Sequence, residues 1–233
     1  MIAPKDPVAR EDPEAREDPV ASKAPAATDP KPMVVLLHGF GAHRLLMSRI
    51  AASFRRAGHA TLNWGYRSWF KPIEYHSERL AERLRQLDED ASVTRIDFVT
   101  HSMGCIVTRA ALLKQLPKKH GRWVMLAPPN RGSIVANRFA PTVGWLLQPV
   151  KELQAKEDSY VNRLAVPSNI EIAVIQAKLD YIVSEPCTRI QEERDRFVVP
   201  GLHSAMLLRK DVARQALHFL EHGCFDASLK AAG

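Results

Sequence analysis

Short apolar runs that alternate with amphipathic segments constrain the fold of this chain more than any other feature. Met33 opens the first run, MVVLLHG, whose continuous apolar character is typical of a strand buried on both faces. The segment that follows, residues 42–58, places Leu46, Ile50 and Phe54 one helical turn apart. Repetition of this strand-then-helix pattern predicts an α/β fold with a mostly parallel, doubly wound sheet and helices on both faces.

The rest of the chain continues the alternation, with one interruption. We expect strands over residues 59–64, 92–100, 122–127, 170–177 and 195–201, and helices over residues 72–87, 103–116 and 210–223. Residues 133–168 break the rhythm, because apolar and aromatic residues stand there between three prolines. This segment is either a small lid over a site or a crossover helix that packs on the sheet.

The first 32 residues differ in character from the rest. A hexapeptide repeats three times there, as DPVARE, DPEARE and DPVASK. Each unit has a proline and little apolar surface, so the segment cannot repay the entropy cost of ordering. We expect residues 1–32 to be a disordered tail and residues 33–233 to form one domain.

Composition and charge exclude several classes of protein. No run reaches the roughly 18–20 apolar residues needed to span a bilayer, and the N-terminus lacks the apolar core of a secretory signal. Three cysteines without CxxC spacing favour a reducing compartment, so the expected location is cytoplasmic. No zinc-finger, RNP-type or basic-region motif points to nucleic acid.

The net charge of +7 is unevenly distributed. Residues 1–32 hold five Lys and Arg against seven Asp and Glu, whereas the remainder holds 28 against 19. The remaining part is therefore strongly basic. Such a surface favours peripheral contact with anionic lipid, although simple solvation by exposed Arg and Lys explains it equally.

A candidate nucleophile stands at the end of the third predicted strand. Residues 100–104 read T-H-S-M-G, with a helix predicted immediately afterwards. This matches the G-x-S-x-G turn, in which a serine occupies the strained tip between a strand and a helix. Gly104 is the small residue required after the turn, whereas Thr100 replaces the usual glycine before it. The alternative is an ordinary turn with Ser102 near a helix cap.

A glycine turn after the first strand is the candidate oxyanion site. The residues are His38, Gly39, Phe40 and Gly41, and backbone N–H groups in such a turn can point at a developing oxyanion. We expect the donors to be the N–H groups of Phe40 and Met103. A dinucleotide-binding fingerprint does not fit, because the third glycine of G-x-G-x-x-G is missing.

The acid partner should follow the nucleophile and stand just beyond a strand. Asp180 meets both conditions, since it lies closely behind the predicted strand 170–177. Glu185, in the same loop, is the reserve candidate. Asp180 could instead serve as a turn or cap residue.

The base must be a histidine beyond that acid, and there are three. His203 follows the last predicted strand in a loop, where it can reach the edge of the sheet. His218 and His222 lie within and at the end of the closing helix, so we expect His203 to be the base. His101 points along the chain, which favours a packing or orienting role. His38 either supports the oxyanion turn or is a core residue.

Together these segments resemble the α/β-hydrolase superfamily, in particular its compact bacterial lipase- and esterase-like members. The resemblance covers residues 33–224 and rests on VVLLHGFG, VTHSMG, MLAPPNRGS, LDYIVSEPCT and VPGLHSAML. It departs from the usual pattern at Thr100 and at Cys105, where a second small residue is common. It implies an α/β-hydrolase fold, a triad of Ser102, Asp180 and His203, and hydrolysis of acyl or lipid esters without a cofactor or metal.

Two other functions share this sequence pattern. A thioesterase or an acyltransferase would use the same triad, and a non-catalytic binding domain would retain only the fold. We therefore expect a serine hydrolase that cleaves carboxylic esters, in particular acyl or lipid esters, through an acyl-enzyme, with a thioesterase or acyltransferase as the alternative.

Overall fold

The structure is a computed structural model that describes residues 29–230. Most of the predicted tail, residues 1–28, therefore lies outside the described residues. The first strand begins at Lys31, two residues before the apolar run that opens at Met33.

One parallel sheet forms the centre of the molecule. Its strands run in the order β2-β1-β3-β4-β5-β6, and every neighbouring pair is parallel. The six strands are β1 (Lys31–Leu37), β2 (Ala60–Trp64), β3 (Val93–His101), β4 (His120–Leu126), β5 (Glu171–Ala177) and β6 (Glu193–Val199). The predicted fold class is confirmed: the order turns back on itself after β2, as in a doubly wound sheet.

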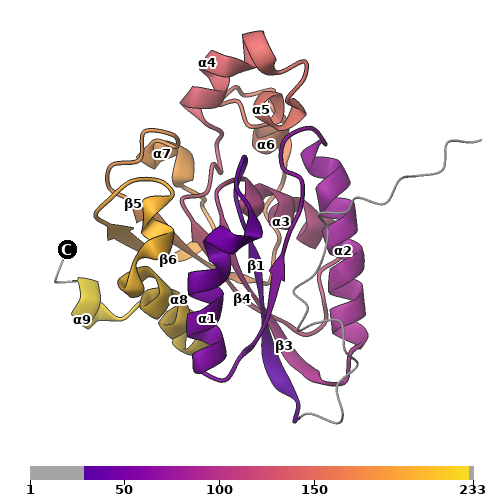
Figure 1. Ribbon diagram of the computed structural model, residues 1–233, viewed down its shortest axis with the longest axis vertical. Coiled ribbons are helices and arrows are strands. Elements are labelled where there is room, and N and C mark those ends of the chain that lie inside the picture. Colours follow the sequence, from indigo (N-terminus) through magenta and orange to yellow (C-terminus); the bar gives the residue numbers. More distant parts are fainter. Residues whose placement is uncertain (1–28, 231–233) are drawn as a thin grey trace, which may run out of the picture.

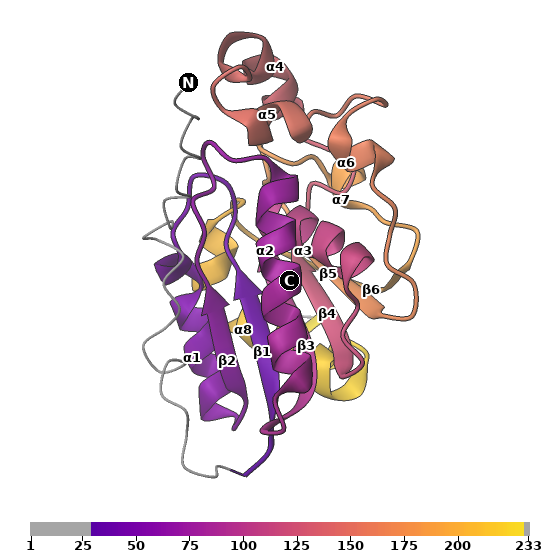
Figure 2. The same ribbon diagram turned by 90° about the vertical axis from the view of Figure 1, so that its right-hand side faces the viewer.

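Alternate residues of the first strand face two separate cores. Val35 and Leu37 pack with α2 (Ile73–Glu89) and α3 (Met103–Lys114) on one face. Val34 and Leu36 pack on the other face, with α1 (Ser48–Arg56) and α8 (Lys210–His222). A strand covered on both faces must be apolar at every position, which explains the uninterrupted run in the sequence. Figures 1 and 2 show the helices on both sides of the sheet.

Short helices were the part of the fold that the sequence pattern did not resolve. The predicted helix over residues 42–58 begins as a 3-10 turn, η1 (Arg44–Met47). Residues 133–168 form three short helices where one crossover helix was an option. The short elements are α4 (Ile134–Val143), α5 (Gln148–Glu152), α6 (Tyr160–Arg163), α7 (Glu185–Thr188), η2 (Ala205–Leu208) and α9 (Ala227–Lys230).

Helices α4 and α5 stand above one end of the sheet, at the top of Figure 1. Ser133 pairs with Gln154 in an isolated parallel bridge, so residues 133–154, here called the roof segment, leave and rejoin the body at one place. No helix within residues 29–230 is long and apolar enough to cross a membrane.

Candidate active site

Ser102 occupies a strained turn between a strand and a helix. β3 ends at His101 and α3 begins at Met103, which leaves Ser102 as the residue that joins them. Its φ of 51° and ψ of −125° lie outside the regions that non-glycine residues favour. Strain of this kind persists only where the surroundings impose it, and it is concentrated at functional sites.

Two close approaches explain the glycines around this turn. A Cβ on Gly104 would lie 2.6 Å from the carbonyl oxygen of His38. A Cβ on Gly39 would lie 2.8 Å from the Cβ of Ser102. Neither position can hold a side chain without moving backbone, so the predicted supporting roles of both glycines have a steric basis.

Thr100 is tolerated in the turn because its side chain points into the core. Its hydroxyl accepts a hydrogen bond of 2.8 Å from the indole N–H of Trp123. The Cys105 thiol donates to the Thr100 carbonyl at 3.1 Å. Burial raises the pKa of Cys105 to about 12, so this thiol stays protonated and is no rival nucleophile. Both departures from the family pattern therefore pack against each other behind the serine.

Asp180 and His203 form a buried pair. The Asp180 Oδ2 atom lies 2.6 Å from His203 Nδ1, and their side chains are 2% and 7% exposed. The second oxygen, Oδ1, accepts hydrogen bonds from the backbone N–H groups of Ile182 and Val183 at 2.9 and 2.8 Å. These bonds hold the carboxylate in one orientation. An imidazole that donates through Nδ1 leaves Nε2 free to accept a proton.

His101 links this pair to the serine. Its ring lies 4.8 Å from the His203 ring, and its Nε2 lies 3.2 Å from the His203 carbonyl oxygen. Burial and the neighbouring His203 hold the pKa of His101 well below its usual range, so its ring is neutral and donates through Nε2. Within residues 29–230, the structure shows no hydrogen bond between Ser102 and His203. Contacts of this type commonly shorten only when substrate binds.

The two predicted oxyanion donors are available. Within the described part of the chain, neither Phe40 N–H nor Met103 N–H donates to another group. Met103 is the first residue of α3, and the first N–H groups of a helix have no intrahelical partner. Phe40 belongs to the turn that directly follows β1.

Two residues that the sequence pattern does not mark fix the candidate oxyanion turn, residues 38–41. The Tyr66 hydroxyl donates to the His38 carbonyl at 2.7 Å, and the Tyr66 ring stacks on the His38 ring with centroids 4.5 Å apart. The Ser68 hydroxyl accepts the Gly41 N–H at 2.9 Å. Both come from the loop after β2, and no local motif marks them.

An apolar cavity of about 330 Å³ opens at Ser102. The roof segment supplies most of its wall, and Phe40, Pro129 and two residues of the Asp180 loop supply the rest. The lining residues are Phe40, Ser102, Pro129, Ser133, Val135, Ala136, Phe139, Val143, Leu147, Val150, Leu153, Ile182 and Val183. Residues 133–154 therefore cover the candidate nucleophile with apolar side chains.

Hydrogen bonds fasten the roof segment to its surroundings. The Ser133 hydroxyl donates to the Ile182 carbonyl at 2.6 Å, which ties the start of the segment to the Asp180 loop. At the other end, Glu152 accepts the Ile73 N–H at 2.8 Å and so caps α2. The Tyr160 hydroxyl donates to Glu74 at 2.7 Å.

Glu152 makes this attachment sensitive to pH. Burial raises the pKa of Glu152 from 4.5 to about 7, and the nearby Glu74 adds to the rise. A raised folded-state pKa means that stability is highest with the proton bound and falls as pH rises from 4.5 to about 7. Glu152→Gln keeps an oxygen that can accept the Ile73 N–H but cannot ionise. We therefore expect it to remove this fall in the free energy of unfolding, which amounts to about 1–3 kcal/mol.

Urea unfolding of both proteins at pH 5 and pH 8 measures the effect. Glu157→Gln, at an exposed site in the same region, is the control and should follow the wild type. If the difference in free energy of unfolding between the wild type and Glu152→Gln is the same at both pH values, the prediction is wrong.

The remaining candidates lie outside this arrangement. Glu185, the reserve acid, pairs with Arg189 on the surface. His218 contacts the Cys224 carbonyl, and His222 is exposed. Within residues 29–230, no three His, Cys, Asp or Glu side chains are grouped as metal ligands.

Comparison with known proteins identifies the family. The model of the alpha/beta hydrolase family matches residues 34–215, which is most of the chain. The chain belongs to this family. No curated protein matches the sequence.

Solved structures of other alpha/beta hydrolases have the same fold. The mature lipase BlEst2 of Bacillus licheniformis is 16% identical, with a TM-score of 0.63 over 83% of this chain and 89% of that one. Lipase B of Aspergillus fumigatus is 15% identical, with a TM-score of 0.65 over 82% of this chain and 53% of that one. A putative hydrolase of Xanthomonas campestris pv. campestris is 14% identical, with a TM-score of 0.57 over 82% and 99%.

Proposed function

We propose that this alpha/beta hydrolase is a serine esterase that cleaves acyl esters through an acyl-enzyme. The observation that carries the proposal is the buried Asp180–His203 pair beside a strained serine at an apolar cavity. A buried carboxylate on Nδ1 orients an imidazole to act as a base, and a strained turn exposes a serine hydroxyl. The lipases among its structural neighbours are consistent with this activity.

The reaction has two steps. His203 Nε2 takes the Ser102 proton as Oγ attacks the ester carbonyl, and the N–H groups of Phe40 and Met103 bind the oxyanion. The imidazolium then protonates the leaving alcohol as the C–O bond breaks. In the second step His203 takes a proton from water, whose oxygen attacks the acyl carbonyl. The bond to Ser102 Oγ then breaks, His203 returns the proton to Oγ, and the carboxylic acid leaves. Asp180 keeps its charge throughout and stabilises the imidazolium.

Labelling with a fluorophosphonate tests the proposal directly. The reagent phosphonylates an activated serine with loss of fluoride, so mass spectrometry of the digested protein should locate the adduct on Ser102. Heat-denatured protein is the control and should not react. Absence of an adduct, or an adduct on another serine, overturns the proposal.

The cavity predicts the kind of acyl group. Its lining is almost wholly apolar, so we expect medium-chain p-nitrophenyl esters to be better substrates than the acetate. Ala136→Phe on α4 should fill the cavity and lower kcat/KM for the octanoate at least about tenfold, because each excluded CH₂ forfeits roughly 0.8 kcal/mol. The acetate is the internal control and should change less than about threefold. Equal losses on both esters would contradict this assignment.

His101 is proposed as a positioning residue for His203. Because its Nε2 donates to the His203 carbonyl, we expect His101→Leu to lower kcat about tenfold or more with little change in KM. His101→Gln, whose amide can donate, should recover part of the loss. A purely packing role predicts the opposite order, with leucine better than glutamine at this buried site.

A further inference from the structure

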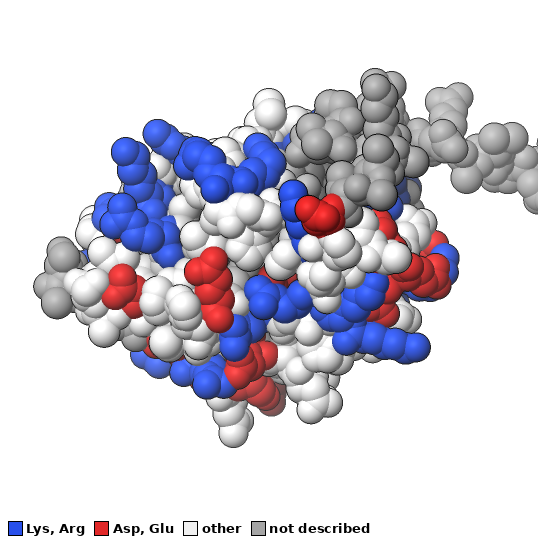
Figure 3. All heavy atoms as spheres, turned by 90° about the horizontal axis from the view of Figure 1, so that it is seen from below, with Lys and Arg blue, Asp and Glu red and all other residues white. Residues whose placement is uncertain are grey.

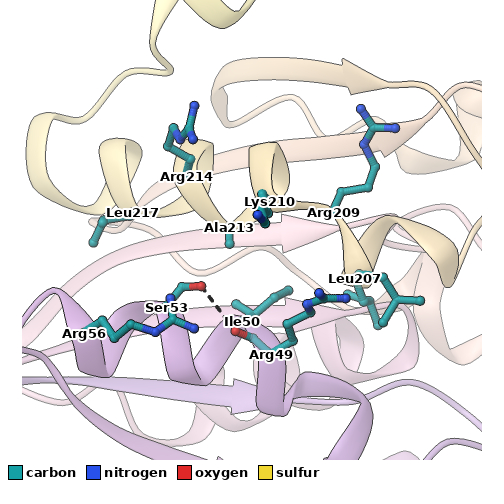
Figure 4. A pocket seen from close by; sticks show the side chains of 11 residues that line it. Arg49, Ile50, Ser53, Arg56, Leu207, Arg209, Lys210, Ala213, Arg214 and Leu217 are labelled. Carbon is teal, nitrogen blue, oxygen red and sulfur yellow. Dashed lines mark hydrogen bonds between the residues drawn. The ribbon is translucent and has the colours of Figure 1, made fainter.

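A second hollow lies on the side of the sheet that carries α1 and α8. It has a volume of about 320 Å³ and shares no lining residue with the cavity at Ser102. Figure 4 shows it between the two helices, with Ile50 and Ala213 at its centre. Ile50, Ala213 and Leu207 of η2 are buried, so the floor of this groove is apolar.

Small side chains explain why the helices leave space here. Ser53 on α1 and Ala213 on α8 both line the groove where larger residues would fill it. The Ser53 hydroxyl is turned back to the Arg49 carbonyl at 3.2 Å, so it does not reach across to α8. The small side chains on the facing surfaces of α1 and α8 therefore leave this space open.

Each helix presents a pair of cations to this groove. Arg49 and Arg56 are two helical turns apart on α1, and Lys210 and Arg214 are one turn apart on α8. Residues at these spacings share a helix face. All four are exposed. In Figure 4, Arg49 and Arg56 lie along the α1 wall, whereas the Arg214 side chain extends from α8 on the side away from α1.

Carboxylates do not balance these charges. No Asp or Glu lines the groove. Arg209, a fifth lining cation, is held by Asp211 at 2.6 Å. In the described part of the chain, the other four cations form no ion pair within 4.0 Å of a carboxylate, although Arg214 interacts at longer range with Asp226. Seen from below, the molecule also exposes more Lys and Arg than Asp and Glu (Figure 3).

We propose that the α1–α8 groove binds a phosphate group that carries an apolar body. A guanidinium group can donate two hydrogen bonds to one phosphate. Within residues 29–230, Arg49, Arg56 and Lys210 have no carboxylate partner, and they repel each other around the hollow until an anion is bound. The apolar floor suits the organic part of the ligand. A free organic phosphate and the head group of an anionic lipid share this chemistry.

Calorimetric titration with inorganic pyrophosphate at low salt tests the phosphate site. We expect the Arg49→Gln, Arg56→Gln double variant to bind at least tenfold more weakly than the wild type. The matched control is Lys118→Gln with Arg163→Gln, which removes the same charge at exposed positions away from the groove. The control should stay within twofold, and circular dichroism should show all three proteins folded.

Sedimentation with vesicles identifies the source of the phosphate. Phosphatidylglycerol–phosphatidylcholine vesicles that pull down the wild type and the control, but not the groove variant, assign the site to a lipid head group. Pyrophosphate binding without vesicle binding assigns the site to a free phosphate compound that is not part of a membrane. The proposal is overturned if the wild type binds neither probe, or if the control weakens as much as the groove variant. Neither assay measures ester hydrolysis, and the groove variant leaves every residue that lines the Ser102 cavity unchanged, so these results are independent of the proposed esterase activity.

Discussion

Replacement of Ser102 with alanine is expected to lower kcat/KM for p-nitrophenyl esters by at least about a thousandfold. Loss of the nucleophile removes the acyl-enzyme route, and only binding and the oxyanion donors remain to accelerate hydrolysis by water. Ser102 makes no side-chain hydrogen bond with the described residues that this change would break. The variant should therefore unfold at nearly the wild-type denaturant concentration.

Ester hydrolysis and fluorophosphonate labelling of this variant should be lost together. Ser168→Ala, an exposed serine in the loop before β5, is the matched control and should keep full activity. If the Ser102→Ala protein retains more than about a tenth of the wild-type activity, Ser102 is not the nucleophile.

Asp180→Asn is expected to lower kcat by about 10² to 10⁴. The amide can donate to Nδ1 of His203, which favours the tautomer with the proton on Nε2, and that tautomer cannot accept the serine proton. The two backbone bonds from Ile182 and Val183 can persist on the amide oxygen. The fold should therefore survive, and the loss should appear in kcat more than in KM.

Glu185→Gln is the matched control for this experiment. Glu185 lies in the same loop, but it pairs with Arg189 and not with His203. Its replacement should change kcat less than about twofold. If Glu185→Gln lost activity while Asp180→Asn kept it, the acid would have to be reassigned to Glu185.

Strands and long helices were predictable because the apolar periodicity of a contiguous stretch of sequence determines each of them. The apolar run before His38 indicated a strand covered on both faces, and the two cores confirm it. Ser102 was recognisable because the strand, turn and helix that position it are contiguous in the chain. The order of Asp180 and His203 relative to strand ends was enough to select the pair that lies 2.6 Å apart.

Contacts between distant segments were not predictable in the same way. Tyr66 and Ser68 hold the candidate oxyanion turn from the loop after β2, and neither stands in a pattern that differs from an ordinary loop. The partners of Thr100 come from a neighbouring strand and from the next helix. The α1–α8 groove depends on two helices far apart in the sequence. In each case the cause is tertiary packing, which local periodicity does not encode.

The bridge between Ser133 and Gln154 brings the two ends of the roof segment together. Because the chain enters and leaves the segment at neighbouring points, a change in its length need not displace the sheet. The sheet and the Asp180–His203 pair lie outside the roof segment. Exchange of the roof segment would therefore change most of the cavity wall while the sheet and the Asp180–His203 pair stay in place.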